Sequence, residues 1–513
     1  MGKYKVKKRA DNKYIYFDIE KIDQYNKIII YGAGIYGRQL LKALNKKNVC
    51  RSFIEVWDKN AQNIDSLYGY KVQHPDFSSL LQCNKTAVVI ALSLLFYSQL
   101  IPDLIKKYKK AGLNNVFLLD FATVTEDEFF ASNFTGNDYS DCYYQADTDF
   151  SKYKPKVKVL AYYLPQFHEI PENNEWWGSG FTEWSNVKTA RPGYCDHYQP
   201  REPHDDFGYY DLSDPNVIKK QAELAKRHGI FGWCMYYYWF SGKKLLEKPI
   251  DLLLENKDID ISFCLMWCNE TWSKRWIGDD AEILIKSEHR EGDPEKFVDD
   301  IKVYTDDRRY IRLHGKPVVI IYNPEMIPDL NNHIKQWQNH AVRIGIGELY
   351  VIINSTRYNV YEDNKLKTYD ATLDFNAFKS IENYFCLLND EGFALSEKMA
   401  FYKEWIDTYI DSADKSENET LLTCSIGYDN SPRYKNGFAN YNVGFSLDGF
   451  YNLSEYIIND AINNNKDFVF IFAWNEWCES AYLEPDKKYG YAVINTLSKA
   501  IYGLPFKNKK ENS

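Results

Sequence analysis

Two glutamates, Glu476 and Glu479, stand three residues apart among aromatic side chains late in the chain. They follow Phe468–Ala473, an apolar run typical of a strand that is buried on both faces. A carboxylate beside apolar surface is costly unless it is paired or shifts its pKa, so two of them suit an acid and a base. Chemistry at the anomeric carbon of a sugar needs such a pair, although two salt-bridged structural glutamates would give the same pattern.

The composition favours a folded, globular protein that is rich in aromatic side chains. Aromatic residues make up 16% of the 513 residues, with 42 tyrosines and 13 tryptophans. Flat aromatic faces stack on sugar rings, and they also serve as packing residues with a polar end. The net charge is −9, and the basic residues form no stripe interleaved with aromatic ones, so nucleic acid is not an expected partner.

The lack of a recognisable secretory signal or membrane span, together with the scattered cysteines, leads us to expect a cytoplasmic protein. The first 17 residues contain no apolar segment of a secretory signal, and no apolar run approaches the ~18 residues of a membrane span. The ten cysteines are scattered, and Cys264 and Cys268 have no second cysteine or histidine pair nearby, so we expect reduced thiols and no metal site. Lysines cluster in Lys3–Arg9 and Lys507–Lys510; we expect solvated tails, with contact to the inner face of the membrane as the alternative.

The N-terminal part has the pattern of a small Rossmann-like α/β domain, which we predict over residues 1–120. A strand at Lys27–Tyr31 is followed by a G-x-G-x-x-G turn and a helix, and a second strand at Ser52–Trp57 ends where a ribose-binding acid falls. The predicted strands are only about half those of a full dinucleotide fold. Bound NAD, another nucleotide or nucleotide-sugar, and a purely structural or docking role are the alternatives for this domain. The candidate nucleotide-binding residues are Gly32, Gly34, Gly37 and Asp58.

The larger part of the chain predicts a (β/α)8 TIM barrel over residues 156–505, after a linker at 121–155 and before a polar tail at 506–513. Eight strand-like runs alternate with helical ones over about 350 residues, and a doubly wound sheet is the alternative. The expected strands are Val157–Leu164, Ile230–Phe240, Ile261–Cys268, Pro317–Asn323, Leu349–Asn354, Ala371–Phe375, Leu421–Ile426 and Phe468–Ala473. The expected helices include Asn216–His228, Lys243–Asn256, Pro294–Tyr304, Asn332–Ile344, Ser396–Asp411, Leu453–Asn464 and Gly490–Ile501.

A barrel of this kind places functional side chains just past the carboxyl ends of its strands. Tryptophan, tyrosine, asparagine and carboxylate residues gather at those positions, which describes a sugar-binding cleft. Tyr162, Tyr236 and Trp233 are interpreted as packing residues. The candidate substrate-binding residues are Tyr163, Gln166, His168, Trp177, Glu183, Trp184, Tyr237, Trp239, Asn269, Glu270, Trp272, Arg275, Trp276, Tyr322, Asp374, Trp474 and Asn475.

Four tryptophan-rich motifs carry a resemblance to a known family. Trp176–Val187, His197–Asp214, Phe263–Trp276 and Ala473–Asp486 resemble the WbsX-type family of bacterial surface-polysaccharide gene sets, whose members are described as glycosyltransferases. The resemblance covers most of residues 157–500. That family is in turn similar to glycoside hydrolase family 99, the endo-α-mannosidases, which are metal-independent (β/α)8 barrels.

The resemblance implies roles for the two glutamates. Glu476 would act as a base on the sugar 2-hydroxyl to give a 1,2-anhydro intermediate, and Glu479 would be the general acid and then the base at the glycosidic oxygen. Glu479 then needs a raised pKa, which we expect Trp477 and Tyr482 to supply as apolar neighbours. No cofactor is expected for the barrel chemistry.

Two positions depart from the family pattern. Ser480 stands where the family often has glycine, and Cys268 where alanine is usual; both residues are small, and we expect little effect.

The resemblance and the motifs together predict a carbohydrate-active enzyme. It would form or remodel glycosidic bonds in the biosynthesis of O-antigen, lipopolysaccharide or capsule, acting on a glycan or sugar donor and a lipid-linked acceptor. A retaining endo-glycosidase of the endo-α-mannosidase type is one alternative, and a non-catalytic glycan-binding barrel is another. An Asp-x-Asp motif of metal-dependent nucleotide-sugar transferases does not follow any predicted strand, whereas both glutamates that catalysis requires are present.

Overall fold

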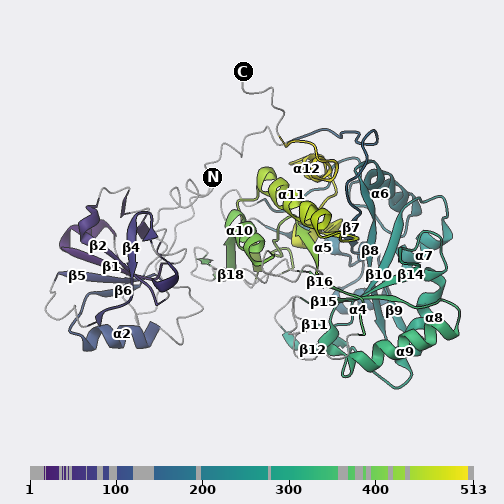
Figure 1. The fold of residues 1–513 in the computed structure, drawn as a ribbon, viewed down its shortest axis with the longest axis horizontal. Helices are drawn as coiled ribbons and strands as arrows, with labels where there is room; N and C mark the ends of the chain where they lie inside the picture. Colours follow the sequence, from purple (N-terminus) through teal and green to yellow (C-terminus); the bar gives the residue numbers. More distant parts are fainter. Residues whose placement is uncertain are drawn as a thin grey trace. The chain divides into compact units, whose positions relative to one another are not determined.

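The computed structural model describes two stretches of the chain. Residues 17–118 are described with gaps, the longest at 78–84 and 92–100, and residues 144–506 with gaps at 192–197, 275–278, 356–367, 376–384, 389–393, 414–419 and 434–438. The chain forms two units, and each is a separate body with its own sheet (Figure 1).

The N-terminal unit is a six-stranded sheet in the order β3-β4-β2-β1-β5-β6. Every neighbouring pair is parallel except β3–β4 at one edge. The sheet has more strands than the predicted half of a dinucleotide fold, because the sequence analysis did not find β4, which is short and half-exposed. The elements are η1 (Ile19–Gln24), β1 (Lys27–Tyr31), η2 (Arg51–Phe53), β2 (Ile54–Trp57), η3 (Ala61–Asn63), β3 (Ser66–Leu67), β4 (Tyr70–Gln73), β5 (Thr86–Ile90), α2 (Ile101–Lys110) and β6 (Val116–Leu118).

The glycine-rich turn after β1 depends on two of its glycines. Gly32 has a φ of +115°, and a Cβ atom at Gly37 would clash with the carbonyl oxygen of Gly32. The carboxylate of Asp58 accepts a hydrogen bond of 2.7 Å from the backbone N–H of Ala33, so it braces the turn itself. Gly34 lies outside the described residues, and nucleotide binding by this turn stays a prediction.

The second unit is a closed barrel of eight parallel strands, as the sequence predicts. Each strand pairs in parallel with the next, and β21 pairs with β7 to close the ring, which excludes the open doubly wound sheet (Figure 1). Its strands are β7 (Val159–Tyr163), β8 (Ile230–Phe240), β10 (Ser262–Trp267), β14 (Lys316–Ile321), β15 (Tyr350–Asn354), β16 (Ala371–Asp374), β19 (Leu421–Ser425) and β21 (Val469–Phe472).

Helices follow most of the barrel strands. They are α4 (Pro171–Trp177), α5 (Glu183–Thr189), α6 (Pro215–Arg227), α7 (Lys248–Glu255), α8 (Asp293–Thr305), η10 (Pro324–Met326), α9 (Leu330–Arg343), α10 (Tyr402–Ala413), α11 (Leu447–Asn463), η11 (Trp477–Glu479) and α12 (Ala492–Tyr502). Strands outside the barrel ring are β9 (Lys243–Leu245), β11 (Trp272–Lys274), β12 (Asp279–Ile285), β13 (Arg312–Leu313), β17 (Phe385–Leu388), β18 (Ala394–Phe401), β20 (Ala439–Val443), β22 (Asn475–Glu476) and β23 (Ala481–Tyr482). No helix in the described part of the chain is long and apolar enough to cross a bilayer.

Two helices begin later than predicted because tertiary pairing overrides local propensity. The predicted helix at Lys243–Asn256 starts with β9, which pairs antiparallel with the end of β8. The predicted helix at Ser396–Asp411 starts within β18, which pairs antiparallel with β17.

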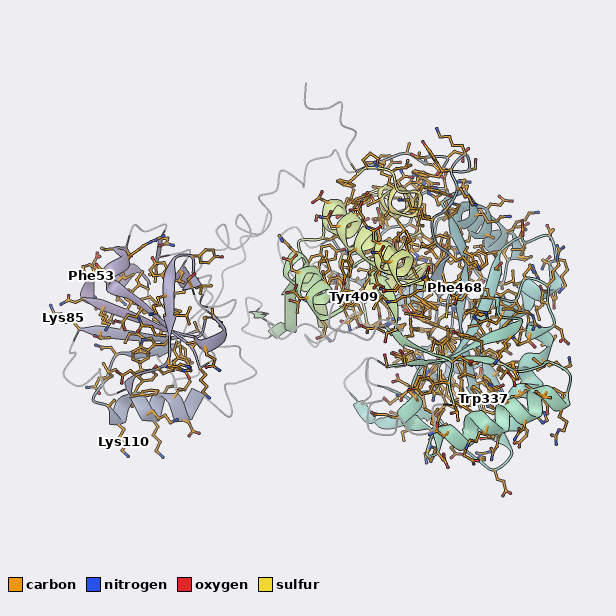
Figure 2. The ribbon with its side chains drawn as sticks, in the orientation of Figure 1. Phe53, Lys85, Lys110, Trp337, Tyr409 and Phe468 are labelled. Carbon is orange, nitrogen blue, oxygen red and sulfur yellow. The ribbon has the colours of Figure 1, made fainter. Side chains whose placement is uncertain are left out.

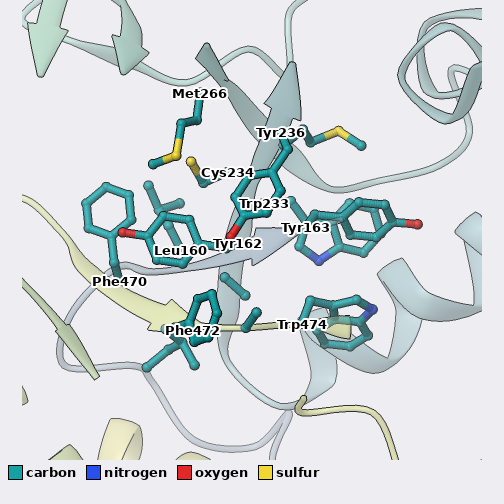
Figure 3. Close-up of a cluster of buried hydrophobic side chains, with 14 of the residues drawn as sticks. Leu160, Tyr162, Tyr163, Trp233, Cys234, Tyr236, Met266, Phe470, Phe472 and Trp474 are labelled. Atoms are coloured by element: carbon teal, nitrogen blue, oxygen red, sulfur yellow. The ribbon is translucent and has the colours of Figure 1, made fainter. Parts of the chain in front are cut away.

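Side chains along each barrel strand alternate between the interior and the helix layer (Figure 3). Tyr162 lies inside, with its ring 5.5 Å from that of Phe470 and 6.1 Å from that of Tyr236. Tyr163, the next residue, lies outside; its ring is 4.6 Å from that of Trp233. This alternation decides which aromatic residues reach the centre of the barrel.

The helix layer buries large side chains against β10. Trp337 of α9, labelled in Figure 2, is fully buried and stacks on Phe297 of α8 at 4.6 Å. His333 of the same helix stacks on Trp267 at 5.7 Å, and its ring lies 6.1 Å from that of His289. Burial, and then the neighbouring His289, lower the pKa of His333 from 6.5 to about 4, against the opposing charge of Asp293.

The buried His333 should therefore lower the stability of the barrel in mild acid. The folded state keeps His333 neutral while the unfolded chain takes up a proton below pH 6.5, so stability falls as the pH drops from about 6.5 to about 4. At pH 5 this contribution of His333 should be about 2 kcal/mol less favourable than at pH 7. Urea unfolding at both pH values should show that His333→Phe gains about this much stability relative to the wild type at pH 5, whereas the exposed control His314→Gln keeps the pH dependence of the wild type. Equal pH dependence in all three proteins would contradict the prediction.

Candidate active site

A cavity of about 300 Å³ opens at the carboxyl ends of the barrel strands. Seven predicted residues line it: Gln166, Trp177, Glu270, Trp272, Tyr322, Glu476 and Glu479. The sequence did not name other lining residues as candidate site residues, among them Tyr236, Tyr238, Cys268, Asn430 and Arg433. The cavity thus combines carboxylates, the guanidinium of Arg433 and several aromatic side chains.

The two glutamates are carried by a short hairpin after β21. Strands β22 and β23 pair antiparallel, with Asn475 opposite Tyr482, and the single turn η11 joins them. Ser480 ends that turn with a φ of +54°, in the left-handed region where glycine is favoured. Gln199 Nε2 donates to Ser480 Oγ at 3.1 Å, a contact that glycine would lack. The expectation that the serine has little effect overlooked this backbone constraint.

Two predicted asparagines brace the loops of the cavity instead of lining it. Asn475 is fully buried, and its amide exchanges hydrogen bonds of 2.8 and 2.9 Å with the backbone of Leu164. Asn269 does the same with the backbone of Asn323, at 2.8 and 2.7 Å. The side chain of Asn323 then donates to Glu270 at 3.0 Å, which fixes that carboxylate on the cavity wall.

Arg433, in the loop after β19, joins three carboxylates. Its guanidinium donates to Glu476 at 3.1 Å, to Glu183 at 3.3 Å and also to Glu479. The side chain of Arg433 is 11% exposed and that of Glu183 is fully buried. Burial alone would lower the pKa of Arg433, but the three carboxylates hold it well above its ordinary value. Buried carboxylates that lie together require a neighbouring cation, and this requirement is the only reason from the sequence to expect an arginine such as Arg433 at the site.

Glu476 is the more buried member of the glutamate pair. Its side chain is 6% exposed, whereas that of Glu479 is 15% exposed. Burial, and then the charge of Glu479, raise the pKa of Glu476 well above its ordinary value, and Arg433 opposes both effects. The structure therefore provides two carboxyl groups in unlike environments, as acid–base chemistry needs.

The aromatic neighbours of the pair have hydrogen-bond partners of their own. Trp477 and Tyr482 stack on each other at 3.8 Å, nearly parallel. Trp477 Nε1 donates to Glu484 at 2.7 Å, and the hydroxyl of Tyr482 donates to Asp486 at 2.7 Å. An effect of these rings on the pKa of Glu479 stays a prediction.

Several aromatic residues line the same cavity as the carboxylates. Tyr238 and Trp272 both line the cavity, and their rings are 5.0 Å apart in an edge-on arrangement. Trp177 and Tyr322 line it as well. Flat faces of this kind beside a few polar groups suit a ligand with both apolar faces and hydroxyl edges.

The other predicted residues that the structure describes do not line the cavity. Tyr237 and Trp239 point outward from β8 and pack on Phe297 of α8, at 6.1 and 5.4 Å. Asp374 lies half-buried at the end of β16, and Arg275 and Trp276 lie outside the described residues. The buried residues that pack or brace without lining the cavity are Tyr163, His168, Trp184, Tyr237, Trp239, Asn269, Trp474 and Asn475.

Comparison with solved structures finds several that are similar to this chain. A GH99 endo-alpha-mannosidase from Bacteroides thetaiotaomicron has a TM-score of 0.40 and 15% identity, covering 67% of this chain and 96% of that one. A protein described as glycoside hydrolase-like has a TM-score of 0.44 and 13% identity, covering 70% of this chain and 98% of that one.

Comparison of sequences gives closer relatives and a family. A protein named WxcX and described as uncharacterized, from Xanthomonas campestris pv. campestris (strain ATCC 33913), is 33% identical over 358 residues, which are 68% of this chain and 50% of that protein. Strain B100 has a protein of the same name that is 33% identical over 352 residues, again 68% of this chain and 50% of that protein. The chain spans about half the length of the curated relatives it matches. The model of the Glycosyltransferase WbsX family matches residues 159–497, which contain all eight barrel strands, and the chain therefore belongs to this family of carbohydrate-active enzymes.

Proposed function

We propose that this chain forms or remodels glycosidic bonds during the biosynthesis of bacterial surface polysaccharide, with Glu476 and Glu479 as its reacting carboxyl groups. The observation that carries the proposal is the placement of both glutamates, bridged by Arg433, on the wall of an aromatic-lined cavity at the catalytic end of a TM barrel. A glycan or sugar donor would bind there, with a lipid-linked glycan as acceptor.

The resemblance to endo-α-mannosidases supplies a reaction for this pair. In the first step O2 bonds to C1 as Glu476 takes the 2-hydroxyl proton, and the C1–oxygen bond to the leaving group breaks as Glu479 gives that oxygen a proton. In the second step the acceptor oxygen bonds to C1 and the C1–O2 bond opens. Glu479 takes the acceptor proton and Glu476 returns its proton to O2, so both carboxyl groups regain their first state.

The environment of Glu476 supports its role as the base. A sugar hydroxyl is a weak acid, and a carboxylate with a raised pKa is a stronger base towards it. Burial raises the pKa of Glu476, and the charge of Glu479 adds to that effect. Arg433 holds the site together while the proton moves, because it donates to both carboxylates.

A turnover assay of the full chain tests the proposal and its alternatives. Nucleotide-sugars with a lipid-linked acceptor are offered in one arm and α-linked manno-oligosaccharides in the other, each with wild type and Glu476→Gln. Transfer that depends on Glu476 supports the proposal. Cleavage without transfer would replace it with a retaining endo-glycosidase, in which water is the acceptor. Sugar binding with neither reaction would leave a glycan-binding barrel.

A further inference from the structure

A third glutamate, Glu484, lies buried behind the hairpin that carries the catalytic pair. The residue is 2% exposed, yet its carboxylate accepts four hydrogen bonds from four side chains. Gln221 Nε2 donates to Oε1 at 2.6 Å, and Trp474 Nε1 donates to the same oxygen at 3.1 Å. Trp477 Nε1 donates to Oε2 at 2.7 Å, and the hydroxyl of Tyr210 donates to it at 2.8 Å. Each oxygen therefore has two donors.

These donors suit an ionised carboxylate. An indole N–H and an amide NH₂ group can only donate, so three of the four partners offer no acceptor to a protonated carboxyl group. The hydroxyl of Tyr163 donates to Gln221 Oε1 at 2.7 Å, which turns the NH₂ end of that amide toward Glu484. The network has one consistent orientation, with Glu484 at its centre as the common acceptor.

The two indoles bracket the segment that carries Glu476. Trp474 directly precedes β22, and Trp477 is the first residue of η11, the turn that ends with Glu479. The backbone N–H groups of Leu483 and Glu484 also donate to the carbonyl of Trp474, at 3.0 and 3.3 Å. The carboxylate of Glu484 thus hydrogen-bonds to both ends of the segment Trp474–Trp477, which leads into the hairpin.

We propose that Glu484 is a positioning residue: by holding the indoles of Trp474 and Trp477 it sets where Glu476 and Glu479 enter the cavity. The inference rests on the proposed function of that pair. Supporting side chains that hold a reacting group in place matter because a displacement of ~1 Å can cost about 10²-fold in rate. Glu484 itself has no place in the cavity lining among the described residues.

The first test needs no substrate. Burial raises the pKa of Glu484 to about 7 despite its four donors. In ¹⁵N-labelled full-length protein, the indole N–H resonances of Trp474 and Trp477 should therefore shift together with a midpoint near pH 7, and Glu484→Gln should remove both shifts. The two signals are assigned with Trp474→Phe and Trp477→Phe. If the two indole signals of the wild type do not titrate together, the proposal that Glu484 holds both indoles is wrong.

The second test is kinetic and separates positioning from folding. Folded Glu484→Gln should lose about 10²-fold in kcat with KM changed by less than about threefold, because it leaves the cavity lining intact. Wild-type kcat in folded Glu484→Gln would overturn the proposal. If Glu476→Gln has full activity instead, the proposed function fails, and the indole titration still reports whether Glu484 holds the hairpin.

A milder variant keeps the test decisive if Glu484→Gln does not fold. Tyr210→Phe removes one donor to the ionised carboxylate and keeps the ring in place. The midpoint of the indole titration should then rise, since a lost donor favours the protonated form, and kcat should fall about fivefold. An unchanged midpoint in Tyr210→Phe would contradict the network as described.

Discussion

Glu479→Gln is expected to lower turnover by about 10²-fold or more while leaving the folded barrel intact. The amide keeps the shape of the side chain and can still accept from Arg433, but it cannot give a proton to the departing oxygen or take one from the acceptor. The measurement is single-turnover rate with the substrate that the wild type uses, together with urea unfolding of both proteins. Glu476→Gln should show a loss of similar size for the first proton transfer.

A matched control separates this loss from any general effect of removing a charge at the rim. Glu325 follows another strand of the same barrel, β14, and is exposed. Glu325→Gln should retain wild-type turnover because its carboxylate lies outside the cavity lining described for the chain. Full activity in Glu479→Gln, or an equal loss in Glu325→Gln, would remove Glu479 from the mechanism.

Arg433→Met is expected to lower the free energy of unfolding by about 3–5 kcal/mol and to abolish turnover. Methionine fills much of the same volume but leaves Glu183, Glu476 and Glu479 without the guanidinium that joins them. Uncompensated buried carboxylates are costly in the folded state, so the loss should shrink as the pH falls and they take up protons. Urea unfolding at pH 7 and pH 5 measures the loss of stability and its dependence on pH.

Two further variants test whether the cost comes from the carboxylates. Adding Glu183→Gln to Arg433→Met should recover part of the lost stability, because one stranded buried charge is then removed. Lys403→Met breaks the exposed pair with Asp407 and should change stability little. If Arg433→Met unfolds at the same urea concentration as wild type, the cluster contributes nothing to the fold.

The barrel was predictable from the sequence because its strands are short apolar runs with helical patterns between them. All eight predicted strands appear within one or two residues of their expected ends, as with Ile230–Phe240. The two late helix starts at Lys248 and Tyr402 were missed, because the residues before them form hairpins with the strands that precede them in the sequence.

The side chains of the site were harder to predict than the strands that carry them. In β8 the sequence analysis named Tyr237 and Trp239 as substrate-binding candidates and interpreted Tyr236 as a packing residue, and both predictions were wrong. The structure places Tyr236 and Tyr238 at the cavity and turns the other two toward α8. Strand alternation allows only these two choices, and one known inward residue on β8 would have decided between them.

Arg433 was missed for a different reason. It sits in a loop that carries no recognisable motif, and its partners lie 43, 46 and 250 positions away in the sequence. Only the physical demand of three neighbouring carboxylates for a cation points to it. Asn269 and Asn475 were predicted to bind substrate because they lie at strand ends. Their buried side chains instead form hydrogen bonds with the backbone.

Closure of the barrel has a consequence for how the protein is made. The first strand, β7, pairs with the last, β21, and Leu164 is bonded to Asn475 across 311 positions of the sequence. Contacts this distant form slowly, because chain entropy must be lost before they return any energy. During synthesis one edge of β7 stays unpaired until β21 has left the ribosome, and an unpaired edge invites aggregation. Glu476 and Glu479 directly follow β21, so the rate at which activity recovers during refolding would report the rate at which β21 pairs with β7 and closes the barrel.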